Sequence, residues 1–258
     1  MMKKTMMAVA ALSATVAMAA DIVSSDVVGY LNTTATKGTS YQGPTFVALG
    51  DGKLSDYKVT GYTGDVDGEM VTISKINAYG VNVKDVIWLD YPEAELYGWY
   101  QYDGESDPVD CNTDPLTAGE CLMVQVQEGA VGWDVTSAGK VEMDGVAVTL
   151  VKGTQYLASA APRDATMEEV IVSGYTGDVD GEVVTVSKLN AYGVNVKDII
   201  WLDYPEAELY GWYQYDGESD PVDCNDDELK AGQGLMVQAQ EGAVGWTLTF
   251  PPAAPSAD

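Results

Sequence analysis

Two glycine-rich acidic motifs are the clearest candidates for metal binding in this chain. The sequence GYTGDVDGE occurs at residues 61–69 and again at 174–182. Oxygen ligands at this density are typical of calcium sites. The spacing differs from an EF-hand loop because Gly68 falls at the fourth position instead of the sixth. The alternative is an acidic hairpin turn that needs glycine for its backbone angles. The candidate Ca²⁺ ligands are Asp65, Asp67, Glu69, Asp178, Asp180 and Glu182.

A longer acidic stretch at 103–118 repeats from Asp216 onward. Its carboxylates suggest either a second cation site or the acid pair of a glycoside hydrolase. Acids on a solvated loop are not held at a working separation, and they lack the raised pKa that acid catalysis requires. The sequence therefore predicts no catalytic residue, and a carboxylate-based hydrolase ranks third among the functions considered.

Aromatic residues gather in one predicted hairpin and in its copy. The chain has 16 Tyr and 6 Trp but only 2 Phe, and Tyr and Trp suit half-hydrated places such as interfaces or sugar-stacking platforms. Neighbours along a strand face opposite sides. One face is expected to lie in the core, and the other to pack under a loop or to form a binding surface. Tyr97 and Trp99 should share one face, and Tyr100 and Tyr102 the other. The candidate binding residues are these four and their copies Tyr210, Trp212, Tyr213 and Tyr215.

The chain has three cysteines, and an odd number in an exported protein implies a free thiol or a bridge between chains. Cys224 is the copy of Cys111, whereas Gly234 stands where Cys121 has its copy. We expect a disulfide between Cys111 and Cys121, with a bridge from Cys111 to Cys224 as the alternative. In the first case Cys224 is an exposed thiol among acids that links chains slowly.

The chain contains no histidine and has a formal net charge of −27. Without histidine it lacks the commonest general base and the usual partner of a nucleophilic Ser or Cys. We therefore expect a protein that is not an enzyme. The negative charge repels nucleic acid and anionic lipid. It suits either simple solubility or the binding of cations and basic partners.

An internal repeat organises these features. Residues 59–133 align with 172–246 without a gap, and 64 of the 75 positions are identical. Each copy follows a lead-in that contains Lys-Gly-Thr-x-Tyr, at 37–41 and 152–156. The sequence thus predicts two tandem units with one fold. The expected segments are a signal peptide at 1–20, β-rich units at 21–133 and 134–250, and a disordered Pro/Ala tail at 251–258.

Within each unit, apolar residues alternate with a period of two between turn residues, which is typical of short antiparallel strands. Residues 86–91 and 96–102 should form a hairpin around the turn at 92–95. A helical stripe occurs only at 165–170. Short strands and frequent glycine favour an all-β protein of two near-identical antiparallel β-sandwiches or small barrels. Further strands are expected at 70–76, 121–127 and 146–151.

The first twenty residues are typical of a secretory signal peptide. Lys3 and Lys4 precede an apolar run at 6–16, and Ala17-Met18-Ala19 resembles a cleavage site. No later stretch is long and apolar enough for a membrane helix. We expect a secreted protein without membrane insertion, located in the periplasm, at the cell surface or outside the cell.

The segment Ser24-Ser25-Asp26-Val27-Val28-Gly29-Tyr30 follows the predicted cleavage site. Together with Val-Ile-Trp-Leu-Asp at 86–90 and the strand at 119–124, it resembles a class of uncharacterised bacterial exported β-rich proteins. The resemblance implies export and a β fold, and it assigns no site residue.

Two functions fit these features. The first is a structural or self-associating protein of the cell surface or extracellular matrix, which suits tandem units and tyrosine-rich faces. The second is a pair of glycan-binding modules, in which Trp and Tyr of residues 96–102 stack on sugar rings and duplication supplies avidity.

Overall fold

The computed structural model describes residues 28–44, 52–61, 70–77, 79–102, 105–140, 144–174, 183–189, 194–215 and 219–252. Within these ranges the chain is all-β, and its helical segments are single 3-10 turns of three residues. No helix in the described ranges is both long and apolar enough to cross a membrane.

The strands fall into a first half, residues 28–140, and a second half, residues 144–252. Those of the first half are β1 (Val28–Thr34), β2 (Gly38–Gln42), β3 (Tyr57–Thr60), β4 (Val71–Ile76), β5 (Asn82–Tyr91), β6 (Leu96–Gln101), β7 (Val109–Asp110), β8 (Leu122–Val126) and β9 (Asp134–Lys140). Those of the second are β10 (Val146–Thr149), β11 (Gly153–Ala158), β12 (Ala165–Thr166), β13 (Ile171–Ser173), β14 (Val184–Leu189), β15 (Asn195–Tyr204), β16 (Leu209–Gln214), β17 (Val222–Asp223), β18 (Glu228–Leu229), β19 (Gly234–Ala239) and β20 (Thr247–Phe250).

Each half contains a six-stranded and a three-stranded antiparallel sheet. The orders are β2-β8-β4-β5-β6-β7 with β1-β9-β3 in the first half, and β11-β19-β14-β15-β16-β17 with β10-β20-β13 in the second. The second half adds the short pair β12-β18. In the first half, Val59 and Val135 of the small sheet share one buried cluster with Ile73 and Val86 of the large sheet. The two sheets therefore enclose a common core.

The boundary expected at 133/134 lies too early. Strand β9 pairs with β1 along its whole length and with β3, so residues 134–140 complete the small sheet of the first half. Strand β20 plays the same part in the second half by pairing with β10 and β13.

The expected hairpin is confirmed as β5 and β6, joined by a 3-10 turn at Pro92–Ala94. Glu95 closes the turn with a positive φ of 56°. The helical stripe at 165–170 does not form an α-helix. Residues 167–169 form only one 3-10 turn, in which Glu169 accepts a hydrogen bond from the backbone N–H of Thr166.

A fully buried tryptophan anchors each hairpin to the rest of its half. Trp99 and Trp212 are both 0% exposed. The indole N–H of Trp99 donates to the carbonyl of Tyr57, and that of Trp212 donates to the carbonyl of Val170 at 2.9 Å. A buried indole N–H needs such a partner.

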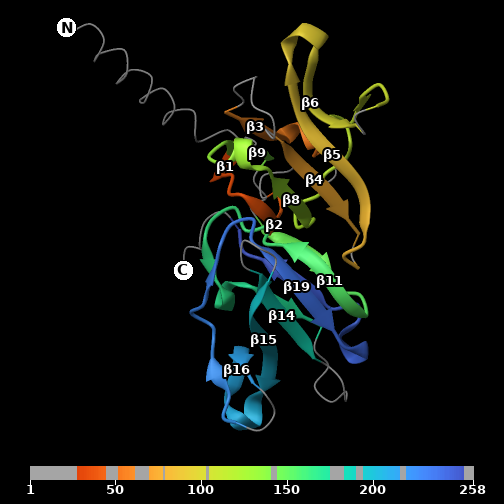
Figure 1. Ribbon diagram of the computed structural model, residues 1–258. Coiled ribbons are helices and arrows are strands. Elements are labelled where there is room, and N and C mark those ends of the chain that lie inside the picture. The colour runs from red at the N-terminus through yellow and green to blue at the C-terminus, as the bar shows by residue number, and fades with distance from the viewer. Residues whose placement is uncertain are drawn as a thin grey trace, which may run out of the picture.

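The two halves meet back to back in the middle of the molecule. The rings of Tyr41 and Tyr156 stack with centroids 5.8 Å apart. Figure 1 shows β2, β11 and β19 at this contact, with the β5–β6 and β15–β16 hairpins at opposite ends. The duplicated hairpins therefore point away from one another.

An asparagine occupies the space beside a glycine in each hairpin. Asn112 Oδ1 accepts a hydrogen bond from the Trp99 backbone N–H at 2.9 Å, and Asn112 Nδ2 donates to the Tyr97 carbonyl at 3.3 Å. Gly98 has a φ of +117°, and a Cβ there would lie 2.1 Å from Asn112 Oδ1. Only glycine leaves room for this arrangement.

We predict that Gly98→Ala lowers the free energy of unfolding by about 2–4 kcal/mol, because it adds the loss of the Asn112 hydrogen bonds to an unfavourable φ. Gly132→Ala is the matched control, since its φ is +90° with no heavy atom within 4 Å of the added Cβ. The control should lose about 1 kcal/mol. Urea unfolding measures both, and equal losses would show that the asparagine does not matter.

Candidate functional site

The aromatic residues of the first hairpin form a row that runs from the core to the surface. Trp88 makes edge-on contacts with Tyr97 and Trp99, at centroid distances of 5.1 and 5.3 Å. The expectation that Tyr97 and Trp99 share a face is thus correct. The copies Trp201, Tyr210 and Trp212 have the same contacts.

Only half of the candidate binding residues reach the surface. Trp99 and Trp212 are fully buried, and Tyr100 and Tyr213 are 7% and 8% exposed. These four belong to the core, and their assignment to a binding surface is corrected. The tyrosines that remain exposed are Tyr97, Tyr102, Tyr210 and Tyr215.

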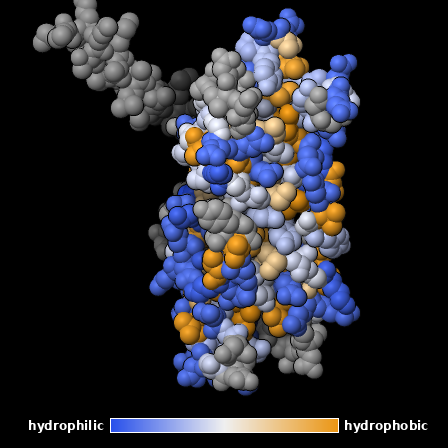
Figure 2. Space-filling model, in the orientation of Figure 1, coloured by the Kyte–Doolittle hydropathy of each residue, from blue (hydrophilic) through white to orange (hydrophobic). Residues whose placement is uncertain are grey.

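Sequence reasoning missed further exposed apolar residues around each hairpin. Tyr91 is 48% exposed, and Val83 and Val109 are about as exposed. The alternating pattern alone places such side chains in the core, because it does not show where the second sheet stops covering the first. Figure 2 shows apolar side chains reaching the surface at several places along the molecule, among hydrophilic ones. The copies of these residues, Tyr204, Val196 and Val222, are also exposed.

A recess of about 380 Å³ opens beside the second hairpin. Trp201 and Tyr210 provide its aromatic side. Carboxylates and an amide provide the polar side, from Glu168, Asp223, Asn225 and Asp226. Aromatic rings beside hydrogen-bonding groups suit a sugar ring, whose faces are apolar and whose rim carries hydroxyls.

The indole N–H of Trp201 has no hydrogen-bond partner within the described part of the chain, and neither does that of Trp88. Both nitrogen atoms are buried. Each ring meets its neighbouring tyrosine nearly edge-on, at an interplanar angle of 75°.

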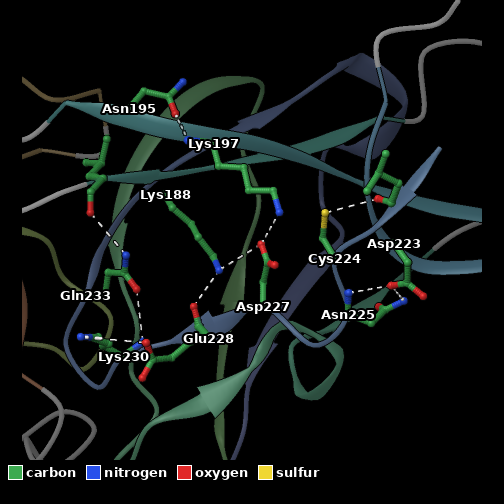
Figure 3. Close-up of polar contacts among 12 residues, drawn as sticks. Lys188, Asn195, Lys197, Asp223, Cys224, Asn225, Asp227, Glu228, Lys230 and Gln233 are labelled. Carbon is green, nitrogen blue, oxygen red and sulfur yellow. Dashed lines mark hydrogen bonds and ion pairs between the residues drawn. The ribbon is translucent and has the colours of Figure 1, made fainter. Parts of the chain in front are cut away.

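Lys188 of β14 and Lys197 of β15 both reach the carboxylate of Asp227 (Figure 3). Asp227 Oδ2 lies 2.7 Å from Lys197 Nζ and 3.5 Å from Lys188 Nζ. The Lys188 side chain is only 9% exposed, and it also donates to the Glu228 carbonyl at 2.7 Å. One carboxylate therefore serves two ammonium groups, one of them almost buried.

The charges in this network shift each other's pKa values. Burial lowers the pKa of Lys188, although Asp227 opposes the shift. Burial alone would raise the pKa of Asp227, but the two lysines outweigh it and hold that pKa below its ordinary value. The hydrogen bond to Asp227 raises the pKa of Lys197. The Asp227 carboxyl is thus ionised in the folded protein at neutral pH.

In the first half, the two corresponding lysines pair with two different acids. Lys84 Nζ pairs with Asp114 Oδ2 at 2.5 Å, and Lys75 Nζ pairs with Glu120 Oε1 at 3.3 Å. Gln233 stands in place of Glu120 in the second half, so Asp227 is the one carboxylate that pairs with Lys188 in the described part of the chain. The acidic stretch therefore contains residues with a structural role: Asp114 forms an ion pair, and Asp110 accepts the backbone N–H of Asn112 at 2.7 Å.

The expected disulfide is wrong. Cys111, Cys121 and Cys224 are all free thiols, and none is more than 1% exposed. The Cys224 thiol donates to the Val222 carbonyl at 3.3 Å, so it is not an exposed link between chains. The acids around Cys224 suggested an exposed thiol, but Asp223 and Asp226 are exposed while the Cys224 side chain is buried. Burial raises the pKa of Cys121 to about 12, which keeps it unreactive.

The calcium motifs at 61–69 and 174–182 lie outside the described residues, apart from Gly61 and Gly174. Asp65, Asp67, Glu69, Asp178, Asp180 and Glu182 therefore remain a prediction. Among the residues that are described, no three acidic or thiol side chains come together as a metal site would require.

Comparisons with known proteins add no assignment. The sequence matches no protein-family model and no curated protein.

We predict that Asp227→Asn destabilises the fold more than Asp114→Asn. The first change leaves two lysines without a carboxylate, one of them nearly buried, and should cost on the order of 2 kcal/mol. The second leaves Lys75 paired with Glu120 and should cost less than about 1 kcal/mol. Urea unfolding at pH 7 measures both changes, and equal losses would contradict the network.

The difference should depend on pH in a defined direction. Because folding lowers the pKa of Asp227, its contribution is complete above its ordinary pKa of about 4. The contribution disappears as the pH falls through the lowered value. The stability gap between the Asp227→Asn variant and the unmodified protein should therefore narrow as the pH falls below about 4, and a gap that stays constant through the acid range would exclude this explanation.

Proposed function

We propose that this chain is a non-enzymatic, exported structural protein that associates with copies of itself at the cell surface or in an extracellular matrix. In this proposal the two halves are tandem, near-identical β-sandwich units. The observation that supports it is the presence of one exposed apolar set twice, once along each hairpin.

The two sets match closely in exposure. Val83 and Val109 are 62% and 59% exposed, and their copies Val196 and Val222 are 59% and 58% exposed. Tyr97 is 55% exposed and Tyr210 is 65% exposed. Tyrosine is enriched at protein interfaces because it offers a large apolar ring with a polar tip. Tyr97 and Tyr210, which lie beside the hairpin turns, thus give each end a side chain of the kind that protein contacts use.

The placement of the two sets determines what association would produce. The β5–β6 and β15–β16 hairpins lie at opposite ends (Figure 1). A contact between ends uses one end of each molecule and leaves the other end free. Such contacts build open chains instead of closed dimers. A molecule with two equivalent ends is therefore suited to a structural role.

We predict that the average mass of the protein rises with concentration in light scattering, and that Tyr97→Ser combined with Tyr210→Ser abolishes the rise. The change removes one large exposed ring at each end and leaves the buried tryptophans in place.

Val131→Ser combined with Val244→Ser is the matched control. These valines are 47% and 46% exposed and lie outside the hairpins, so this pair should associate like the unmodified protein. The proposal would be contradicted by a mass that is independent of concentration in the unmodified protein. It would also be contradicted by an equal loss of association in the tyrosine and valine double variants.

Glycan binding is the second candidate, and the recess beside Trp201 and Tyr210 favours it. Tyr210 offers a ring face at the surface, and three carboxylates line the other side. Ser55 and Thr113 stand in the first half where Glu168 and Asp226 stand in the second. The second recess is therefore the more acidic, and an amino sugar would suit it best.

For this candidate we predict that a glucosamine tetramer binds in calorimetry, and that Tyr210→Ala weakens binding at least tenfold. Tyr97→Ala is the matched change in the first half and should weaken it less than threefold. The absence of heat at millimolar tetramer, or equal effects of the two changes, would remove this function from consideration.

A further inference from the structure

The contact between the two halves is built from equivalent positions on both sides. Gly43 N–H donates to the Gly232 carbonyl at 3.0 Å, and Ala158 N–H donates to the Gly119 carbonyl at 2.9 Å. Gly119 and Gly232 are copies in the repeat. Gly43 directly follows β2 and Ala158 is the last residue of β11, and these positions are equivalent because the two strands pair in the same register with β8 and β19. The contact therefore resembles the two-fold interface of a homodimer.

Further pairs follow the same pattern. Isolated β-bridges join Gln42 to Gln233 and Leu157 to Glu120, and these two pairs are also equivalent. The stacked rings of Tyr41 and Tyr156 lie where the two lead-in strands meet. Each half contributes the same structural elements, although the side chains differ at several positions.

The differences between the halves make the contact selective. A Cβ added to Gly43 would lie 2.3 Å from Ala158 Cβ and 2.3 Å from the Glu120 carbonyl oxygen. Two second halves would place an alanine at this position on both sides. The Glu120 carbonyl belongs to the first half itself, so the obstacle across the contact is the Ala158 Cβ. A Cβ atom is fixed to its backbone, so the observed approach does not tolerate a second methyl group there.

A pair of first halves meets a different obstacle. A Cβ added to Gly234 would lie 2.6 Å from both the Cβ and the carbonyl oxygen of Tyr41. Cys121 is the residue that the first half has at this position. The close approach seen here is therefore available to one first half and one second half, and not to two of the same kind.

The contact can also open without disrupting either core. The buried cluster of the first half contains only residues of that half, and the cluster of the second half takes in one residue from outside, Ala118. The chain passes from the first half to the second through the short segment between Lys140 and Val146. Short connections of this kind favour exchange of domains between chains.

We propose that this contact is an exchangeable docking surface, on which the first half of one copy accepts the second half of another. At low concentration the connection favours docking within one chain. At high concentration the same contact forms between chains, always between unlike halves. This route to association goes beyond the proposed function, because it uses neither hairpin end.

The test uses the full chain with Cys121→Ser, which removes the thiol nearest to the contact. One sample contains Tyr41→Cys chains, a second contains Tyr156→Cys chains, and a third is a concentrated mixture of both. Under mild oxidation, non-reducing electrophoresis should show a disulfide-linked dimer at least fivefold more abundant in the mixture than in either single sample. The double variant should close a disulfide within one chain.

Each other outcome would overturn the proposal. A mixture without dimer, beside a double variant that closes, would show that the halves do not exchange. Equal dimer in the single samples would show that like halves pair. An open double variant would contradict the contact itself. Repeating the mixture with Tyr97→Ser and Tyr210→Ser separates the proposals, because exchange should persist when association through the ends is lost.

Discussion

The close backbone approach of the two halves determines where every other surface of the molecule lies. Gly43 and Gly234 allow the approach, since a Cβ at Gly43 would collide with Ala158 Cβ and a Cβ at Gly234 with Tyr41 of the other half. Because the lead-in strands meet there, the large sheets extend away from the contact and the hairpins lie at opposite ends (Figure 1). The proposed association through both ends of the molecule depends on this arrangement rather than on any single exposed residue.

Several carboxylates of this acidic chain have structural partners within their own half. Asp114 and Asp227 form ion pairs with lysines of the hairpin strands. Asp110 and Asp223 accept hydrogen bonds from Asn112 and Asn225, the asparagines that contact each hairpin. These acids are bound to partners in the fold. Acids without such partners, such as Asp226 beside Tyr210, are the ones left for a ligand.

Much of the fold could be predicted from the sequence. The β5–β6 hairpin could be predicted because the turn residues at 92–95 separate two strand-like stretches. The boundary between the halves could not be predicted in this way. Strand β9 follows the repeated core, and only its pairing with β1, more than a hundred residues earlier, shows where it belongs.

The candidate site was predicted only in part, for a related reason. Trp99 and Tyr97 have the same orientation in the strand, and their burial differs because the second sheet covers one and ends before the other. The disulfide failed because sequence spacing does not show which way a thiol points. Lys188 and Asp227 could have been found by noting that a lysine interrupts a buried strand pattern, which requires a partner acid.

The central claim is that the halves dock as one body with their hairpins at opposite ends. Spin labels at Glu95→Cys and Glu208→Cys, the two hairpin turns, test it most directly by pulsed electron resonance. A narrow distance distribution between the two labels, longer than that between either label and one placed at Thr39 in β2, is the predicted result. A broad distribution, or a distance between the turns shorter than the distance to Thr39, would contradict it.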